Sequence, residues 1–170
     1  IEHLTNVNVN QQASLNRTNS TLQATRLSMA RLYEELIEPQ TTLTNEERQQ
    51  RANELHSSLN STQDVFSNFI SLPADAAHEA IISPIVTSFD TMIDVHLLPQ
   101  VAALYEGDTV TYREQRDAAY QAYAAFYQDA IGFFHQVEKE GNNRLTNFDS
   151  VISLSTITII TVFIIALMVT

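Results

Sequence analysis

Cysteine is absent from the 170-residue chain, and glycine and proline are scarce, with three and four residues. Without cysteine, neither a disulfide scaffold nor thiol chemistry is available. Alternation of apolar and polar residues with a period of two is also missing before residue 151, so nothing there indicates a strand. These absences predict an all-α protein in which the few Pro and Gly residues mark helix ends.

Basic residues are scarce as well: eight Arg and the single Lys139 stand against twenty acids, for a net charge of −11. Phosphate backbones attract Lys/Arg-rich faces, so we expect no nucleic acid among the partners. The acidic surface instead favours a soluble domain.

Recognisable catalytic and metal-binding patterns are missing too. The five His residues fall on four different segments with no i, i+4 pair, and no Glu-x-x-His pair of the di-iron type occurs. Nucleophile elbows and Gly-rich phosphate loops are absent. We therefore expect no catalytic residues, no metal and no cofactor.

One long hydrophobic run is present, from Val151 to Thr170, and it carries no charge, Pro or Gly. At about 1.5 Å per residue, such a helix covers the ~30 Å hydrocarbon layer of a bilayer. We predict two parts: an extracytoplasmic bundle over 1–150 and a transmembrane helix over 151–170. Because the chain begins at Ile1 without an initiator Met, we also expect a preceding membrane helix and a following cytoplasmic portion.

A seven-residue repeat marks the first helix. Leu15, Leu22, Met29 and Leu36 recur at this interval, with Thr18, Thr25 and Leu32 between them. Polar residues weaken a sealed core, so the two threonines on this seam favour a subunit interface or a wet site. We therefore predict a parallel homodimer that pairs through the first helix.

Helix-ending and helix-capping residues divide the chain into four predicted helices near 1–38, 44–71, 75–104 and 109–150. Pro39 ends the first, and Thr44 with Glu47 forms a capping box for the second. The third carries an apolar stripe at Ile82, Ile85, Phe89, Met92 and His96. Gly107 and Asp108 form the turn into the fourth. The fold class is thus an antiparallel up-down four-helix bundle whose fourth helix continues into the membrane, past Gly141-Asn142-Asn143.

Two stretches within this order resemble the four-helix-bundle sensing domain of the enteric aspartate and serine chemoreceptors, which are bacterial methyl-accepting chemotaxis receptors. The stretch from Leu22 to Arg31 is similar to the family's pair of arginines five apart, and the stretch from Gly107 to Tyr112 is similar to its turn into the fourth helix. The resemblance implies a ligand bound between two subunits, with Arg26 of one and Arg31 of the other meeting a carboxylate.

The resemblance also implies that Tyr112 and Gln115 take a ligand amino group through their backbone carbonyls. The chain departs from the family where Glu35 replaces an expected arginine and Asp117 replaces an expected threonine. Both changes should disfavour dianions, while Arg113 and Arg116 offer replacement positive charge. Alternatively, Glu35 or Asp117 holds a ligand amine, or pairs with Arg26 or Arg31 without any ligand.

The expected site thus consists of Arg26, Arg31, Tyr112, Gln115, Arg116 and Asp117. We expect the extracytoplasmic ligand-binding domain of a transmembrane chemoreceptor in the bacterial inner membrane, with its sensing part in the periplasm. Its partner is a small organic acid or amino-acid-like molecule, and signal transduction runs through the fourth helix. Alternatives are the sensing bundle of a membrane histidine kinase or cyclic-dinucleotide enzyme, and a non-sensing membrane-anchored bundle.

Overall fold

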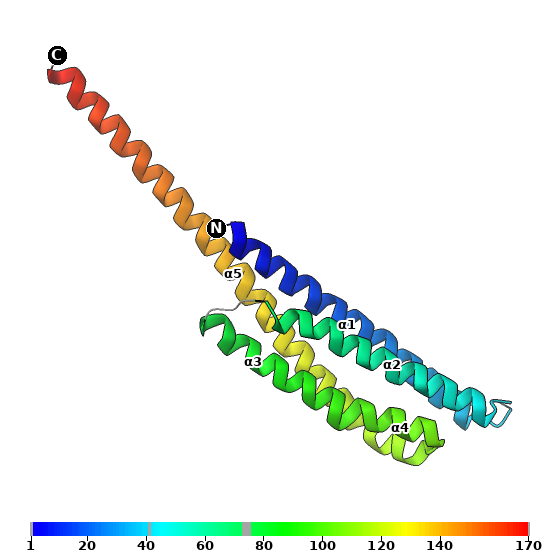
Figure 1. Ribbon diagram of the computed structural model, residues 1–170. Coiled ribbons are helices and arrows are strands. Elements are labelled where there is room, and N and C mark those ends of the chain that lie inside the picture. The colour runs from blue at the N-terminus through cyan, green and yellow to red at the C-terminus, as the bar shows by residue number, and fades with distance from the viewer. Residues whose placement is uncertain (1, 41, 73–75, 170) are drawn as a thin grey trace. The chain divides into compact units, whose positions relative to one another are not determined.

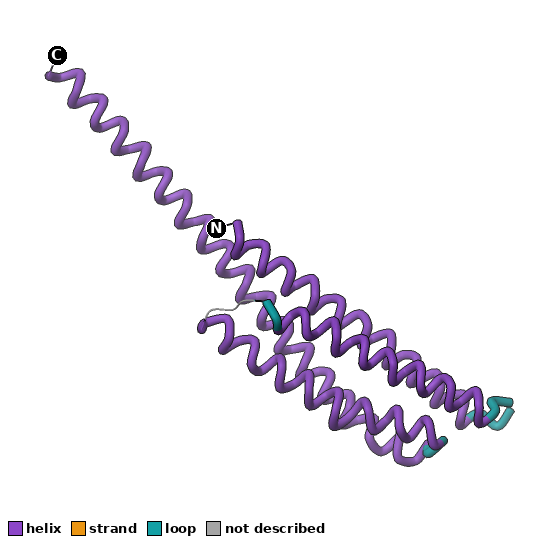
Figure 2. Tube along the Cα trace, in the orientation of Figure 1, coloured by secondary structure: helices purple, strands orange, loops and turns teal. Residues whose placement is uncertain are grey.

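A computed structural model describes the backbone of residues 2–40, 42–72 and 76–169. Side chains are described for residues 9–140 other than 41 and 73–78, and for 142 and 143. Within these ranges the chain is helical apart from short loops, and no strand occurs (Figure 2). The all-α prediction is confirmed.

The elements follow in the order α1 Glu2–Ile37, α2 Asn45–Ile70, α3 Ala76–Asp90, η1 Thr91–Leu97, α4 Leu98–Glu106 and α5 Thr109–Val169. Because α3, η1 and α4 are contiguous, they form one of the four arms of the bundle (Figure 1). The first three predicted helices end within two residues of these bounds, and the fourth begins at the predicted residue.

The chain divides into two compact units, Ile1–Phe133 and Phe134–Thr170. The first unit is the bundle, in which each arm runs opposite to the one before it (Figure 1). The second consists of the C-terminal part of α5, which passes through the sequence Gly141-Asn142-Asn143 without a break, as predicted. The side chains of 151–170, the predicted membrane segment, lie outside the described residues, so that assignment stays a prediction.

The capping box predicted for α2 is confirmed. The Thr44 hydroxyl accepts a hydrogen bond from the Glu47 backbone N–H at 3.2 Å, and the Glu47 carboxylate accepts one from the Thr44 N–H at 2.9 Å. Two amide donors at the helix start thus find partners. At the other turn, Gly107 adopts φ +76°, and the Asp108 carboxylate accepts the Thr111 N–H at 2.9 Å to cap α5.

Phenylalanine rings fill the centre of the bundle. Phe66 of α2 stacks on Phe89 of α3 with ring centroids 3.8 Å apart, and both lie against Phe126 of α5. Phe69 and Phe133 make an edge-on pair farther along. All five rings are almost completely buried, so each contributes about 1.5–3 kcal/mol of hydrophobic stabilisation and together they hold α2, α3 and α5.

The heptad seam of α1 faces the core of its own subunit, so its assignment to a subunit interface was wrong. Leu15, Thr18, Leu22, Thr25, Met29 and Leu32 are all buried. The Thr18 hydroxyl donates to the Ser14 carbonyl at 2.9 Å, and the Thr25 hydroxyl shares a 2.6 Å hydrogen bond with the Ser58 hydroxyl of α2. Satisfied in this way, threonine hydroxyls are tolerated in a sealed core.

The third arm contains a π-helical segment that the sequence did not indicate. Pro99 lacks an N–H, and its ring collides with the carbonyl four residues back in a regular helix. Directly before it, η1 widens to i→i+5 bonding, and the Leu98 N–H donates to the Ile93 carbonyl. As a result the buried stripe moves from Met92 to Ile93 and reaches Leu97 in place of the expected His96, which is only half-buried.

Among the described side chains, one run, Glu79–Glu106, is long and apolar enough by length and composition to cross a membrane. Its apolar residues Ile85, Phe89, Met92 and Leu97 are buried inside the bundle. We therefore interpret this run as one of the helical arms that form the core of the bundle. The predicted membrane helix remains 151–170.

Candidate ligand-binding site

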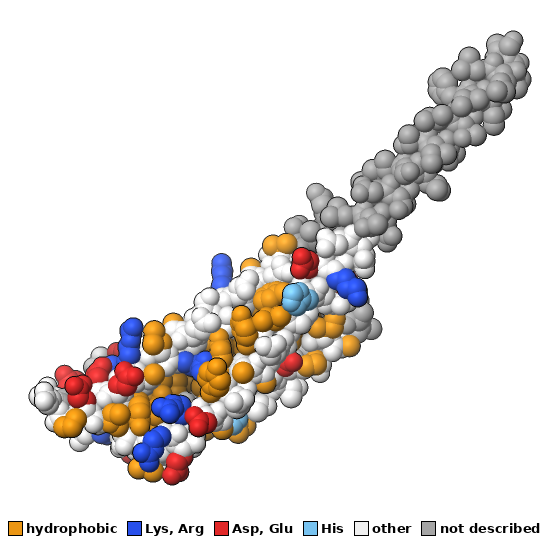
Figure 3. All heavy atoms as spheres, turned by 180° about the vertical axis from the view of Figure 1, so that it is seen from behind, with side chains coloured by type: hydrophobic (Ala, Val, Ile, Leu, Met, Phe, Trp, Pro, Cys, Tyr) orange, Lys and Arg blue, Asp and Glu red, His pale blue; other side chains and the backbone are white. Residues whose placement is uncertain are grey.

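A cavity of about 220 Å³ opens between α1, α4 and α5. It is lined by Arg26, Met29, Ala30, Gln100, Tyr112, Arg116, Asp117, Ala119 and Tyr120. Four of the six residues expected in the ligand site thus line one cavity within one subunit: Arg26, Tyr112, Arg116 and Asp117. On the face shown in Figure 3, charged side chains gather toward the end of the bundle that holds the α1–α2 and α4–α5 connections.

Arg26 lies on two tyrosine rings of α5. Its guanidinium carbon is 4.0 Å from the centroid of the Tyr123 ring and 5.8 Å from that of Tyr120. Cation–π contacts of this kind contribute about 0.5–2 kcal/mol. The Tyr123 hydroxyl donates to Asn19 Oδ1 at 2.7 Å and accepts from Gln23 Nε2 at 3.0 Å, which fixes the ring under the guanidinium.

The edges of the Arg26 guanidinium remain available. No described residue forms an ion pair or hydrogen bond with it. Stacking on a ring engages the face of the guanidinium and leaves its N–H groups, which point outward in the plane, free to donate. Arg26 is therefore held in place and ready to bind a planar oxyanion such as a carboxylate.

Tyr112 forms part of the cavity wall at the start of α5. Its ring is buried and stacks on Tyr33 of α1, with centroids 4.7 Å apart. Burial raises the pKa of Tyr112, so its hydroxyl keeps its proton throughout the neutral range. A protonated phenol can donate a hydrogen bond to a ligand oxygen.

Arg116 and Asp117 form the solvent side of the cavity. The Arg116 Nε and the Asp117 Oδ1 are 3.9 Å apart, and the Asp117 side chain is 95% exposed. Such an exposed contact contributes little to stability. Neither residue pairs with Arg26 or Arg31 within the subunit.

Two of the expected residues lie elsewhere. Arg31 is exposed and lines a separate cavity of about 310 Å³ between α1 and α2, together with Arg51 and Ser58. Gln115 is half-buried with an unpartnered Oε1, and it does not line the cavity of Arg26. A single subunit therefore does not bring Arg31 or the Gln115 side chain to Arg26.

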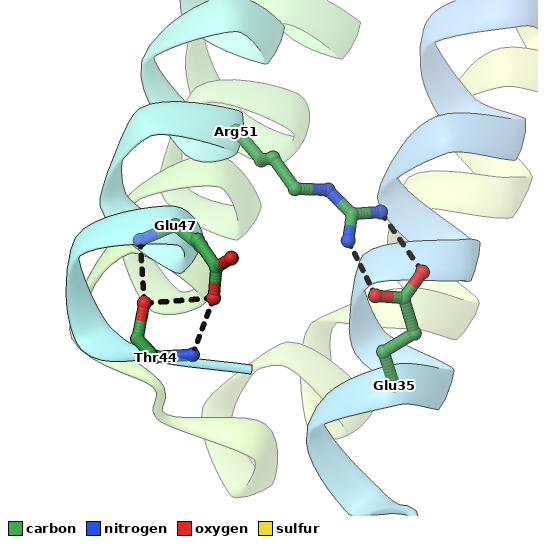
Figure 4. Close-up of polar contacts among 4 residues, drawn as sticks. All are labelled: Glu35, Thr44, Glu47 and Arg51. Atoms are coloured by element: carbon green, nitrogen blue, oxygen red, sulfur yellow. Dashed lines mark hydrogen bonds and ion pairs between the residues drawn. The ribbon is translucent and has the colours of Figure 1, made fainter. Parts of the chain in front are cut away.

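Glu35 forms a two-bond pair with Arg51 of α2 (Figure 4). The Arg51 hydrogen bonds lower the pKa of Glu35. The alternative in which Glu35 pairs with Arg26 or Arg31 does not occur within the subunit. Arg51 neutralises the Glu35 carboxylate. Glu35 should therefore repel a dianionic ligand less strongly than we expected from the sequence, where it replaces an arginine.

Tyr120, Tyr123, Gln100 and Arg51 were not predicted as site residues. One signal for Gln100 was present, since it is polar on the otherwise apolar spacing of Leu97, Val101 and Leu104. Among the described residues, no group of three His, Asp or Glu side chains is arranged to hold a metal ion.

The bundle thus carries a cavity lined by hydrogen-bond donors from α1, α4 and α5. A family model described as Tar ligand binding domain homologue matches residues 1–136. The chain belongs to this family of chemoreceptor ligand-binding domains. No curated protein and no solved structure matches the chain.

Proposed function

We propose that the domain is the periplasmic sensor of a transmembrane chemoreceptor and that it binds a small carboxylate-bearing molecule at Arg26. The observation that carries this proposal is a half-buried guanidinium, held on tyrosine rings and without an ion-pair partner in the described part of the chain. Family membership supports a ligand-binding role.

The same helix that lines the cavity also contains the predicted membrane segment. Tyr112 and Asp117 of α5 form part of the wall, and α5 continues to Val169. A ligand that binds one position of α5 better than another shifts the equilibrium between those positions. We propose that this bias on α5 is the signal passed to a cytoplasmic output module.

A second subunit is part of this proposal. Arg31 lies on a different side of α1 from Arg26, as expected for residues about 140° apart on a helix. A second copy packed against α1 can bring its Arg31 toward the Arg26 of the first. The exposed side of α1 carries Val9 and Leu27, which are 56% and 53% exposed and suit a homodimer contact.

The test is calorimetry and thermal shift with a panel of short carboxylates, amino acids and amines. We expect at least one carboxylate to raise the melting temperature, because a ligand that binds only the native state stabilises it. Arg26→Ala should weaken its binding by roughly ten- to a hundredfold. The matched control is Arg17→Ala, which removes an exposed guanidinium from the same helix and should leave affinity unchanged. Equal affinity in wild type and Arg26→Ala contradicts the site.

A further inference from the structure

Gln100 is a buried polar side chain on the core-facing side of α4. It is 4% exposed, and its Nε2 has no hydrogen-bond partner. Buried amide groups are nearly always paired, because an unpaired donor loses its water partners without replacement. Gln100 lines the same cavity as Arg26, and its Nε2, which is closed off from the cavity, reaches an acceptor there only when the side chain turns toward the cavity.

The walls of this cavity are rich in hydrogen-bond donors that come from three helices. Arg26 of α1 offers free N–H groups, Gln100 of α4 an unpaired amide, and Tyr112 of α5 a protonated hydroxyl. Asp117 is the one carboxylate among the described lining residues, and its side chain points largely into solvent. Such a cavity suits a ligand with several oxygen acceptors and few donors.

Resting on the function proposed above, we propose that Gln100 is a ligand-binding residue and that the cavity binds a short 2-hydroxy or 2-keto monocarboxylate. Arg26 receives the carboxylate through its guanidinium edge, and the Gln100 amide donates to the oxygen on the second carbon. These two contacts distinguish such an acid from a plain fatty acid of the same length.

The size and lining of the cavity agree with this class. A cavity of about 220 Å³ has room for a three- or four-carbon acid. Met29, Ala30 and Ala119 supply an apolar surface for its methyl end. No second free cation lies deep in the described wall to receive another carboxylate, because Arg116 is exposed.

The experiment compares L-lactate, pyruvate and propionate by calorimetry on the whole chain in detergent. Lactate and propionate differ by one hydroxyl, so their affinity ratio isolates the oxygen at the second carbon. We expect wild type to prefer lactate and pyruvate by about tenfold, the value of one hydrogen bond to an otherwise unsatisfied buried donor. Gln100→Leu should abolish this preference and leave propionate binding unchanged.

A second readout guards against a merely structural effect. Gln100→Leu removes an unpaired buried donor, so the ligand-free variant should melt at a higher temperature than wild type. Gln128→Leu, at an exposed position of α5, is the matched control and should change neither measurement. A Gln100→Leu variant that melts lower and keeps the lactate preference overturns the inference.

Failure of this inference can be told apart from failure of the proposed function. If all three acids bind equally and Arg26→Ala weakens all of them, Gln100 has no role and the carboxylate site stands. If none of the three binds, the proposed ligand class is wrong, and the wider carboxylate panel then decides the function. If no carboxylate binds, both proposals are wrong.

Discussion

Gly107 and Arg48 close the turn between α4 and α5 together. The Arg48 Nε donates to the Tyr105 carbonyl at 2.9 Å, and its Nη1 donates to Asn45 Oδ1 at 2.9 Å, so one side chain joins the start of α2 to this turn. Gly107 has φ +76°, a conformation that side chains with a Cβ avoid. A Cβ built on it would lie 2.7 Å from the Arg48 Nη1.

Gly107→Ala should therefore destabilise the bundle. The left-handed backbone costs a non-glycine residue about 1–2 kcal/mol, and displacement of Arg48 adds to that. Urea unfolding followed by circular dichroism measures the loss. The matched control is Gly132→Ala, where an added Cβ meets nothing within 4 Å in the middle of α5, and it should stabilise by about 0.5–1 kcal/mol. Loss of stability in both variants would contradict this account of Gly107.

A reciprocal pair of hydrogen bonds caps the start of α2. Thr44→Ala removes the hydroxyl that accepts the Glu47 N–H, and it should cost about 1 kcal/mol of unfolding free energy. Thr42→Ala, in the same loop but outside the cap, should stay within about 0.5 kcal/mol of wild type. Chemical unfolding of both variants at neutral pH gives the comparison.

The cost of Thr44→Ala should also depend on pH. Hydrogen bonds from the Thr44 N–H and hydroxyl lower the pKa of Glu47, so its folded pKa lies below its unfolded value of about 4.3. The resulting stabilisation is present above that value and is lost as the pH falls through the folded pKa. The difference between wild type and Thr44→Ala should thus shrink when unfolding is repeated near pH 3. A constant difference from neutral to acid pH would show that the hydrogen bond from the Thr44 hydroxyl to the Glu47 carboxylate does not contribute.

Helix boundaries were predictable because local chemistry sets them. Pro39, the Thr44–Glu47 capping box and Gly107 act within a few residues, so no tertiary information was needed. The face that α1 buries was not predictable, since a heptad seam is equally compatible with a partner helix in the same subunit or in another. The pair of Glu35 with Arg51 depends on how α1 and α2 align, which spacing along one helix does not show.

In the candidate site, only the residues within short recognisable stretches of a single helix were predictable. Arg26 and Tyr112 were recognised from short stretches of α1 and α5. Gln100 belongs to α4, whose faces are offset by the π-helical segment before it, so a uniform helical period did not place it beside Arg26. Tyr123, the half-buried platform for the guanidinium, lies outside both of those stretches.

At the scale of the whole molecule, the proposed homodimer makes a prediction about disulfide crosslinking. The chain has no cysteine, so an introduced one is unique. Leu27→Cys, on the exposed side of α1, should crosslink between subunits of the full chain in membranes. Leu22→Cys, which is fully buried in the subunit core, should not. Nonreducing electrophoresis after mild oxidation reads out both, and crosslinking of Leu22→Cys alone would place the interface elsewhere.

The π-helical segment η1 has a consequence for chain length. The buried stripe passes from Met92 to its neighbour Ile93 within η1. This helical arm therefore contains one residue more than a regular α-helix would need to bury the residues before and after η1. A chain without that residue, for example without the exposed Val95, keeps Phe89 and Leu104 in the core after a local return to α-helix. We therefore expect a variant of this chain that lacks Val95 to fold, although loops are the usual place for such a deletion.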